Sequence, residues 1–117
     1  MRIPKDPREL TIAMMSRSIC NVQVGAVLVD AWGIFSWGYN HVGEGFGQHA
    51  EAHCLHRANM ARVEGATMYV AAQRMRNRKP IMAMPCDECR KIVKKCKYVI
   101  YRDPNEDWMM MGVPYEG

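Results

Sequence analysis

Two short segments of the sequence carry side chains that can bind a metal ion. The first is His49-Ala50-Glu51 and the second is Pro85-Cys86-Asp87-Glu88-Cys89. One imidazole and two thiolates fill three positions of a tetrahedral zinc ion and leave the fourth for water, which is the arrangement of a catalytic site. A closed structural zinc site and a redox-active Cys-x-x-Cys pair are the alternatives for the same residues.

Both segments lie where the sequence predicts the start of a helix. Pro85 suits a first helical turn, so Cys86 and Cys89, three residues apart, are expected on one helix face with their sulfurs close together. A helix N-terminus also favours thiolates over thiols, and the thiolate is the form that binds metal. Glu51 lies two residues after His49, in the first turn of the other predicted helix, where it can take a proton from the water and deliver it to a substrate.

The rest of the chain predicts alternating helices and strands. Helices are expected at residues 7–19, 49–62 and 85–95, and strands at residues 22–29, 34–39, 67–72, 97–102 and 108–113. This order, α-β-β-α-β-α-β-β, predicts an α/β fold with a mixed five-stranded sheet and helices on its faces. Only 15 residues follow Arg102, too few for a parallel crossover and another strand. The last strand is therefore expected to form a C-terminal β-hairpin, the alternative being a tail folded over the sheet.

Length and composition indicate one small globular domain over residues 1–117, with 49% apolar and 24% charged residues. No apolar run approaches the roughly 18 residues of a membrane helix, and the first residues lack the apolar stretch of a secretory signal. The five cysteines are an odd number, which suits metal ligands, reactive thiols or core residues in a reducing compartment better than disulfides. The sequence therefore predicts a cytoplasmic protein.

Positive charge is concentrated in one stretch. Residues 74–97 carry nine basic and two acidic side chains, a net charge of +7, whereas the remainder carries −3. One interpretation is a solvated helix face with a mobile loop that keeps the protein soluble. The other is an electrostatic field that attracts a phosphate-bearing ligand, either a nucleotide or a nucleic acid.

The two motifs together match the H-x-E and P-C-x-x-C signature of zinc deaminases. Over roughly residues 12–102 the chain resembles the cytidine and deoxycytidylate deaminase superfamily. Residues 21–30 and 38–40 are similar to the first hairpin of that family and the loop that meets the sugar, and residues 65–70 resemble the strand before its cysteine motif.

The resemblance implies a three-layer cytidine-deaminase-like fold, a Zn²⁺ cofactor and self-association into homo-oligomers. It implies a hydrolase that removes an exocyclic amine as ammonia. The implied zinc ligands are His49, Cys86 and Cys89, with Glu51 as the proton carrier. The resemblance further implies that Asn40 hydrogen-bonds the sugar and that backbone near Ala50 and Met84 frames the base. His41, beside Asn40, is a further candidate for substrate contact. His53 is interpreted as a residue that either supports the metal ligands or packs, and Cys54 as a small core residue.

The substrate that we expect is the cytosine of a free cytidine or deoxycytidine nucleotide or nucleoside, with a monophosphate favoured by the basic stretch. The loop at residues 73–83 is longer and more basic than is usual in the family, and His49 stands where enzymes for free cytidine usually have a cysteine. One alternative is deamination of a base in single-stranded DNA or tRNA, although residues 74–97 lack the aromatic side chains on which such strands stack. The other is a non-catalytic zinc-binding interaction module, which would have no need of Glu51.

Overall fold

The computed structural model describes residues 6–41 and 49–111. Its helices and strands follow one another as α1 (Pro7–Arg17), β1 (Val22–Asp30), β2 (Gly33–Tyr39), α2 (Ala50–His56), α3 (Met60–Val63), β3 (Thr67–Arg74), β4 (Pro80–Ile81), α4 (Asp87–Val93), β5 (Tyr98–Arg102) and β6 (Trp108–Met110). Among these described helices, none is long and apolar enough to cross a bilayer.

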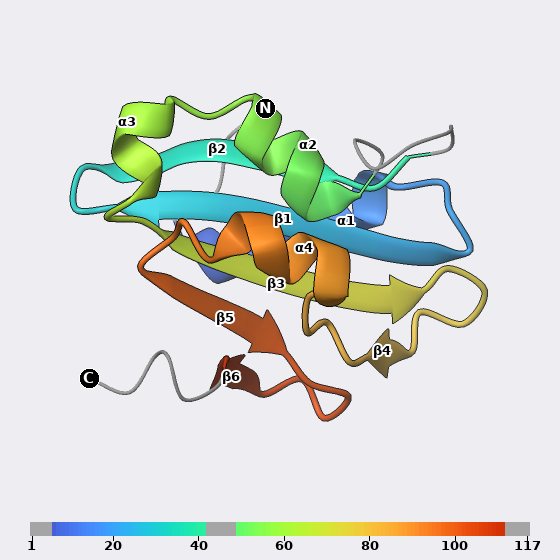
Figure 1. Ribbon diagram of the computed structural model, residues 1–117. Helices are drawn as coiled ribbons and strands as arrows, with labels where there is room; N and C mark the ends of the chain where they lie inside the picture. Colours follow the sequence, from blue (N-terminus) through green and yellow to red (C-terminus); the bar gives the residue numbers. More distant parts are fainter. Residues whose placement is uncertain (1–5, 42–48, 112–117) are drawn as a thin grey trace.

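The strands form one mixed sheet in the order β2-β1-β3-β5-β6, with β4 paired to the end of β3. Strands β3 and β5 are parallel, and the other pairs are antiparallel. Helices α2 and α4 lie on one face of the sheet and α1 lies on the other (Figure 1). The predicted α/β class and the layered arrangement of helices around a mixed sheet are confirmed, and so is the antiparallel hairpin of β5 and β6.

The structure corrects three details of the predicted elements. The sheet has six strands instead of five, because the predicted loop at residues 73–83 contains β4, which pairs with β3. The predicted helix at residues 49–62 is broken, because the Asn59 side chain accepts a hydrogen bond from the Ala61 N–H (3.0 Å) and caps a separate helix, α3. Pro85 precedes α4 instead of opening it, because Cys86 has extended backbone angles and acts as the N-cap.

Apolar side chains fill the space on both faces of the sheet. Under α2 and α4, buried positions at alternate residues of β1 and β3 form the larger cluster, with Ala26, Leu28, Met68 and Val70 all fully buried. On the opposite face, Leu10 and Met14 of α1 pack against Val27 of β1. This second contact is close, because Gly25 of β1 lies directly against the backbone of α1.

Replacing Gly25 by alanine is expected to destabilise the protein by about 3 kcal/mol or more, because the new Cβ would overlap backbone atoms of Thr11 and Met15. Chemical denaturation followed by circular dichroism measures the loss. Gly65→Ala is the matched control, since a Cβ at Gly65 meets no atom within 4 Å, and its stability should stay within about 1 kcal/mol of wild type. Equal stability of the two variants would contradict the close approach of α1 and β1.

An ion pair ties α3 to the β1–β2 hairpin. Arg62 donates to both carboxylate oxygens of Asp30 at 2.6 and 2.7 Å, and its guanidinium lies 4.3 Å from the centre of the Phe35 ring. The hydrogen bonds from Arg62 lower the pKa of Asp30 to about 2.

The low pKa of Asp30 in the folded state gives this ion pair a pH-dependent contribution to stability. The contribution is present above the pKa of the unfolded chain, about 4, and is lost as the pH falls toward 2. We expect Asp30→Asn to lower the urea midpoint at pH 6 and to match the wild type near pH 2. A difference in midpoint that is the same at both pH values would contradict a role for the ionised pair.

Candidate active site

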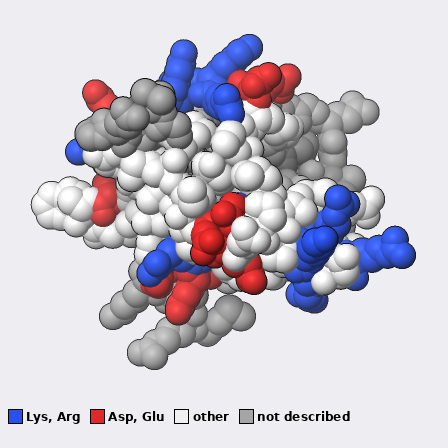
Figure 2. Space-filling view, turned by 90° about the horizontal axis from the view of Figure 1, so that it is seen from below, with Lys and Arg blue, Asp and Glu red and all other residues white. Residues whose placement is uncertain are grey.

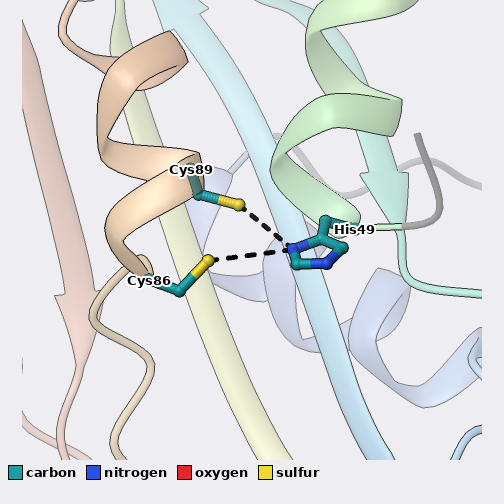
Figure 3. Close-up of side chains that lie close together, drawn as sticks. All are labelled: His49, Cys86 and Cys89. Atoms are coloured by element: carbon teal, nitrogen blue, oxygen red, sulfur yellow. Dashed lines mark hydrogen bonds between the residues drawn. The ribbon is translucent and has the colours of Figure 1, made fainter. Parts of the chain in front are cut away.

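His49, Cys86 and Cys89 converge in the space between the first turns of α2 and α4. His49 is the N-cap of α2, Cys86 is the N-cap of α4, and Cys89 lies in the first turn of α4. Figure 3 shows the two sulfurs directed toward the imidazole from the neighbouring helix. The predicted helix starts thus bring together side chains that are 37 and 40 residues apart in the chain.

The spacing of these three donor atoms fits a zinc ion. The Nδ1 atom of His49 lies 3.3 Å from Sγ of Cys89 and 3.9 Å from Sγ of Cys86, and all three donor atoms lie within 4.8 Å of one another. Zinc–sulfur bonds of about 2.3 Å and zinc–nitrogen bonds of about 2.0–2.1 Å at tetrahedral angles place sulfur and nitrogen about 3.5 Å apart. Among the described residues the group offers three donors, which leaves one tetrahedral position for water or substrate.

The two cysteines differ in their surroundings. Cys89 is 1% exposed, whereas the Cys86 side chain is open to solvent. Burial, followed by the nearby Glu51 and Cys86, raises the pKa of the Cys89 thiol above its usual range. A divalent cation reverses this preference, because a thiol that coordinates zinc loses its proton. The site therefore has a buried thiol that becomes an anionic ligand when a cation is present.

Glu51 is buried in the first turn of α2, with 6% of its surface exposed. Burial raises the pKa of its carboxyl group, and the neighbouring His49 and Cys89 oppose this rise. Glu51 lines a cavity of about 270 Å³ together with Val24, Asn40, His41, His49 and Ala50. A buried carboxyl beside His49 and Cys89, on the wall of a cavity, has the placement of an acid–base group.

Asn40 holds the end of β2 against the start of β1. Its Oδ1 accepts from the Val24 N–H (2.8 Å), its Nδ2 donates to the Val22 carbonyl (2.7 Å), and its own N–H donates to the Val24 carbonyl (3.1 Å). The amide therefore reaches the cavity wall while already bonded to the backbone of β1. One lone pair on Oδ1 and one hydrogen on Nδ2 are not used by these bonds.

His41 and His53 form an aromatic cluster with Tyr39 next to the cavity. The two imidazole rings are 4.9 Å apart between centroids, and the rings of Tyr39 and His53 are 5.5 Å apart. Nδ1 of His53 contacts the backbone of Tyr39, and burial lowers the pKa of this imidazole. His53 thus joins α2 to β2, in keeping with the packing role expected for it, whereas His41 itself lines the cavity.

Met84 does not line the cavity that Asn40, His41, His49, Ala50 and Glu51 share. It packs against the larger apolar cluster, and its sulfur accepts a hydrogen bond from Nη2 of Arg90 at 2.8 Å. Arg90 also donates from Nε to the Pro85 carbonyl at 3.3 Å, so it braces the segment that leads into Cys86. Sequence reasoning did not single out Arg90, because a lone arginine after a Cys-x-x-Cys carries no spacing signal.

Comparison with known protein families gives a match over most of the chain. The family described as the cytidine and deoxycytidylate deaminase zinc-binding region matches residues 7–102. This range contains the three metal donors and Glu51. Comparison with curated protein sequences gives no match.

Three solved structures illustrate the likeness in fold. A cytidine deaminase from Burkholderia pseudomallei has a TM-score of 0.68 and 23% identity, with 91% of this chain and 89% of that chain covered. A dCMP deaminase from the cyanophage S-TIM5 in apo form has a TM-score of 0.62 and 23% identity, with 83% and 79% covered. Acinetobacter baumannii RibD has a TM-score of 0.57 and 22% identity, and the match covers 82% of this chain but 27% of that chain. At these identities the likeness shows the fold alone.

Proposed function

The chain belongs to the cytidine and deoxycytidylate deaminase family, and we propose that it is a zinc-dependent hydrolase that converts the cytosine of a free cytidine or deoxycytidine nucleotide or nucleoside to uracil. The observation that carries this proposal is the buried Glu51 carboxyl on the wall of a cavity beside His49. A purely structural zinc site has no need of such a carboxyl. Cytoplasmic location and self-association, expected from the sequence, stay predictions.

In the proposed mechanism, His49, Cys86 and Cys89 hold the zinc ion and Ala50 contributes backbone to the wall around the base. When bound, zinc supplies Lewis-acid activation of water at neutral pH. The close spacing of the three donor atoms supports the role of these residues as zinc ligands. Asn40 and His41 line the same cavity and are suited to contact the sugar. The volume of this cavity, about 270 Å³, is near the lower end of the volumes of small-molecule binding sites.

Glu51 moves the protons in the proposed reaction. Its carboxylate takes a proton from the attacking water and gives it to the ring nitrogen next to the carbon that bears the amine. The water oxygen forms a bond to that carbon, and the bond from the carbon to the exocyclic nitrogen breaks. The second proton of the water passes to this nitrogen, which leaves as ammonia, and the water oxygen becomes the carbonyl oxygen. One water is consumed, and one carbonyl product and one ammonia are formed.

Deamination in water enriched in oxygen-18 tests the proposal directly. Zinc-loaded protein is incubated with deoxycytidine and with its monophosphate, and the product is analysed by mass spectrometry while ammonia is quantified. We expect one ammonia per uracil product and one heavy oxygen in the new carbonyl. A folded, zinc-loaded protein that releases no ammonia from either compound would favour a non-catalytic zinc module instead.

A further inference from the structure

Arg74 extends the line of β3 side chains that lies under the helices of the site. Met68, Val70 and Ala72 occupy alternate positions of β3 and are buried in the cluster beneath α2 and α4. Arg74 ends the strand and continues this alternation, since every second side chain of a strand points to the same face. Arg74 is exposed, so the row of apolar side chains ends in a cation at the C-terminal end of β3.

The register of the sheet places this cation next to the wall of the cavity. Val24, which lines the cavity, pairs with Ala72, and Val22 pairs with Arg74. The carbonyl of Val22 accepts the hydrogen bond from the Asn40 side chain. Arg74 therefore lies two residues along β3 from Ala72, about 7 Å farther on, on the face of the sheet that carries the cavity-lining Val24. The side chain of Asn40, the residue after β2, points toward the same end of β1, since it donates to the Val22 carbonyl.

The turn that follows Arg74 is a hydrogen-bonded hairpin between β3 and β4. The Arg74 N–H donates to the Lys79 carbonyl at 3.0 Å, the Arg78 N–H donates to the Arg74 carbonyl at 2.8 Å, and the Met75 N–H donates to the Asn21 carbonyl at 2.9 Å. The last of these bonds fixes the turn against the residue that precedes β1. These three hydrogen bonds therefore fix the backbone at Arg74.

The β3–β4 hairpin concentrates positive charge. Residues 74–79 include Arg74, Arg76, Arg78 and Lys79, and residues 65–86 contain no Asp or Glu. Within the described ranges, the ion pairs to carboxylates are those of Arg8, Arg62 and Arg102, and none involves this hairpin. Figure 2 shows basic side chains gathered at the right-hand edge, the end of the molecule at which Figure 1 places the β3–β4 turn.

We infer that Arg74, supported by the β3–β4 hairpin, is the subsite for the 5′-phosphate of a cytidine or deoxycytidine monophosphate. This inference rests on the proposed function, since it assumes that the cytosine ring occupies the cavity beside Glu51. An arginine suits the role because its planar guanidinium donates two parallel hydrogen bonds to a phosphate. The other cations of the turn add to the attraction without needing direct contact.

The structure favours a single nucleotide over a nucleic-acid strand. Binding of single strands relies on exposed aromatic side chains near the charged groove. Within residues 6–41 and 49–111, Trp32 is the most exposed large aromatic residue, with 88% of its surface exposed. It lies in the β1–β2 turn, at the end of β1 opposite Val22 and therefore away from the hairpin (Figure 1).

Steady-state kinetics with paired substrates tests this inference. Deoxycytidine and its monophosphate are compared in the wild type, Arg74→Ala, Arg74→Lys and the control Lys94→Ala, a solvent-exposed cation at the end of α4. We expect the wild type to favour the monophosphate. Arg74→Ala should lower kcat/KM for the monophosphate by about 10- to 100-fold, chiefly through KM, and leave kcat/KM for deoxycytidine within about twofold. Arg74→Lys should retain part of the preference, and Lys94→Ala all of it.

Three outcomes would overturn the subsite. The first is equal kcat/KM for deoxycytidine and its monophosphate in the wild type. The second is an equal loss for both substrates in Arg74→Ala, which would assign the residue a structural role. The third is faster deamination of a cytosine in a single-stranded oligonucleotide than of the monophosphate. If the wild type acts on none of these substrates, the proposed function fails, and the subsite fails with it.

Discussion

Replacing Glu51 by glutamine is expected to reduce kcat for ammonia release by about 10²- to 10⁴-fold, the usual contribution of a general acid–base group. The amide has the size of the carboxyl but cannot accept and return a proton at neutral pH. Because Glu51 is buried and does not belong to the group of three metal donors, the variant should fold and keep its zinc. Stopped-time ammonia assays and zinc analysis of the same sample measure both quantities.

Glu64→Gln provides the control for this substitution. Glu64 is exposed at the C-terminal end of α3, so its amide variant should match the wild type in rate, zinc content and stability. If Glu51→Gln keeps full activity, Glu51 is not the proton carrier. If it loses zinc along with activity, the carboxyl has a ligating or structural role instead.

Replacing Cys89 by alanine is expected to weaken zinc binding by at least about 100-fold, since changes to partners outside the ligand shell already cost 10- to 100-fold. Activity should fall in parallel. Cys89 is the buried sulfur of the group, 3.3 Å from the nitrogen of His49, so its loss removes one of the three donors. Competition with a chromogenic zinc chelator measures the affinity.

Cys20→Ala is the matched control for this experiment. Cys20 lies before β1 and is not part of the donor group found among the described residues. The control should bind one zinc ion per chain with unchanged affinity. Zinc affinity that is equal in the wild type, Cys89→Ala and Cys20→Ala would place the metal elsewhere in the molecule.

The donor group could be predicted from the sequence because its signals are local. His49 and Cys86 each stand directly before a helix, and the three-residue spacing of Cys86 and Cys89 brings both sulfurs to one end of α4. Helix starts have strong sequence signals, since capping residues and first-turn preferences act over a few residues. The antiparallel pairing of β5 and β6 agrees with the hairpin that the turn-forming residues after Arg102 predict.

Features that depend on tertiary contacts could not be predicted. Strand β4 has two residues and exists because Pro80 and Ile81 pair with the end of β3, and no periodic pattern can reveal so short a strand. The sugar contact that the resemblance implies for Asn40 stays a prediction. The hydrogen bonds from both of its side-chain polar atoms to β1 depend on how the end of β2 lies against β1, which the sequence does not show. The position of Arg74 beside the cavity likewise requires the pairing of β1 with β3.

Zinc reconstitution of the metal-free protein tests the central claim most directly. Increasing zinc is added to chelator-treated protein, and ammonia release from deoxycytidine monophosphate is measured together with bound metal. We expect activity to rise in proportion to bound zinc and to reach its plateau at one ion per chain. Full activity in the metal-free protein, or no ammonia release with one zinc ion bound per chain, would contradict the account.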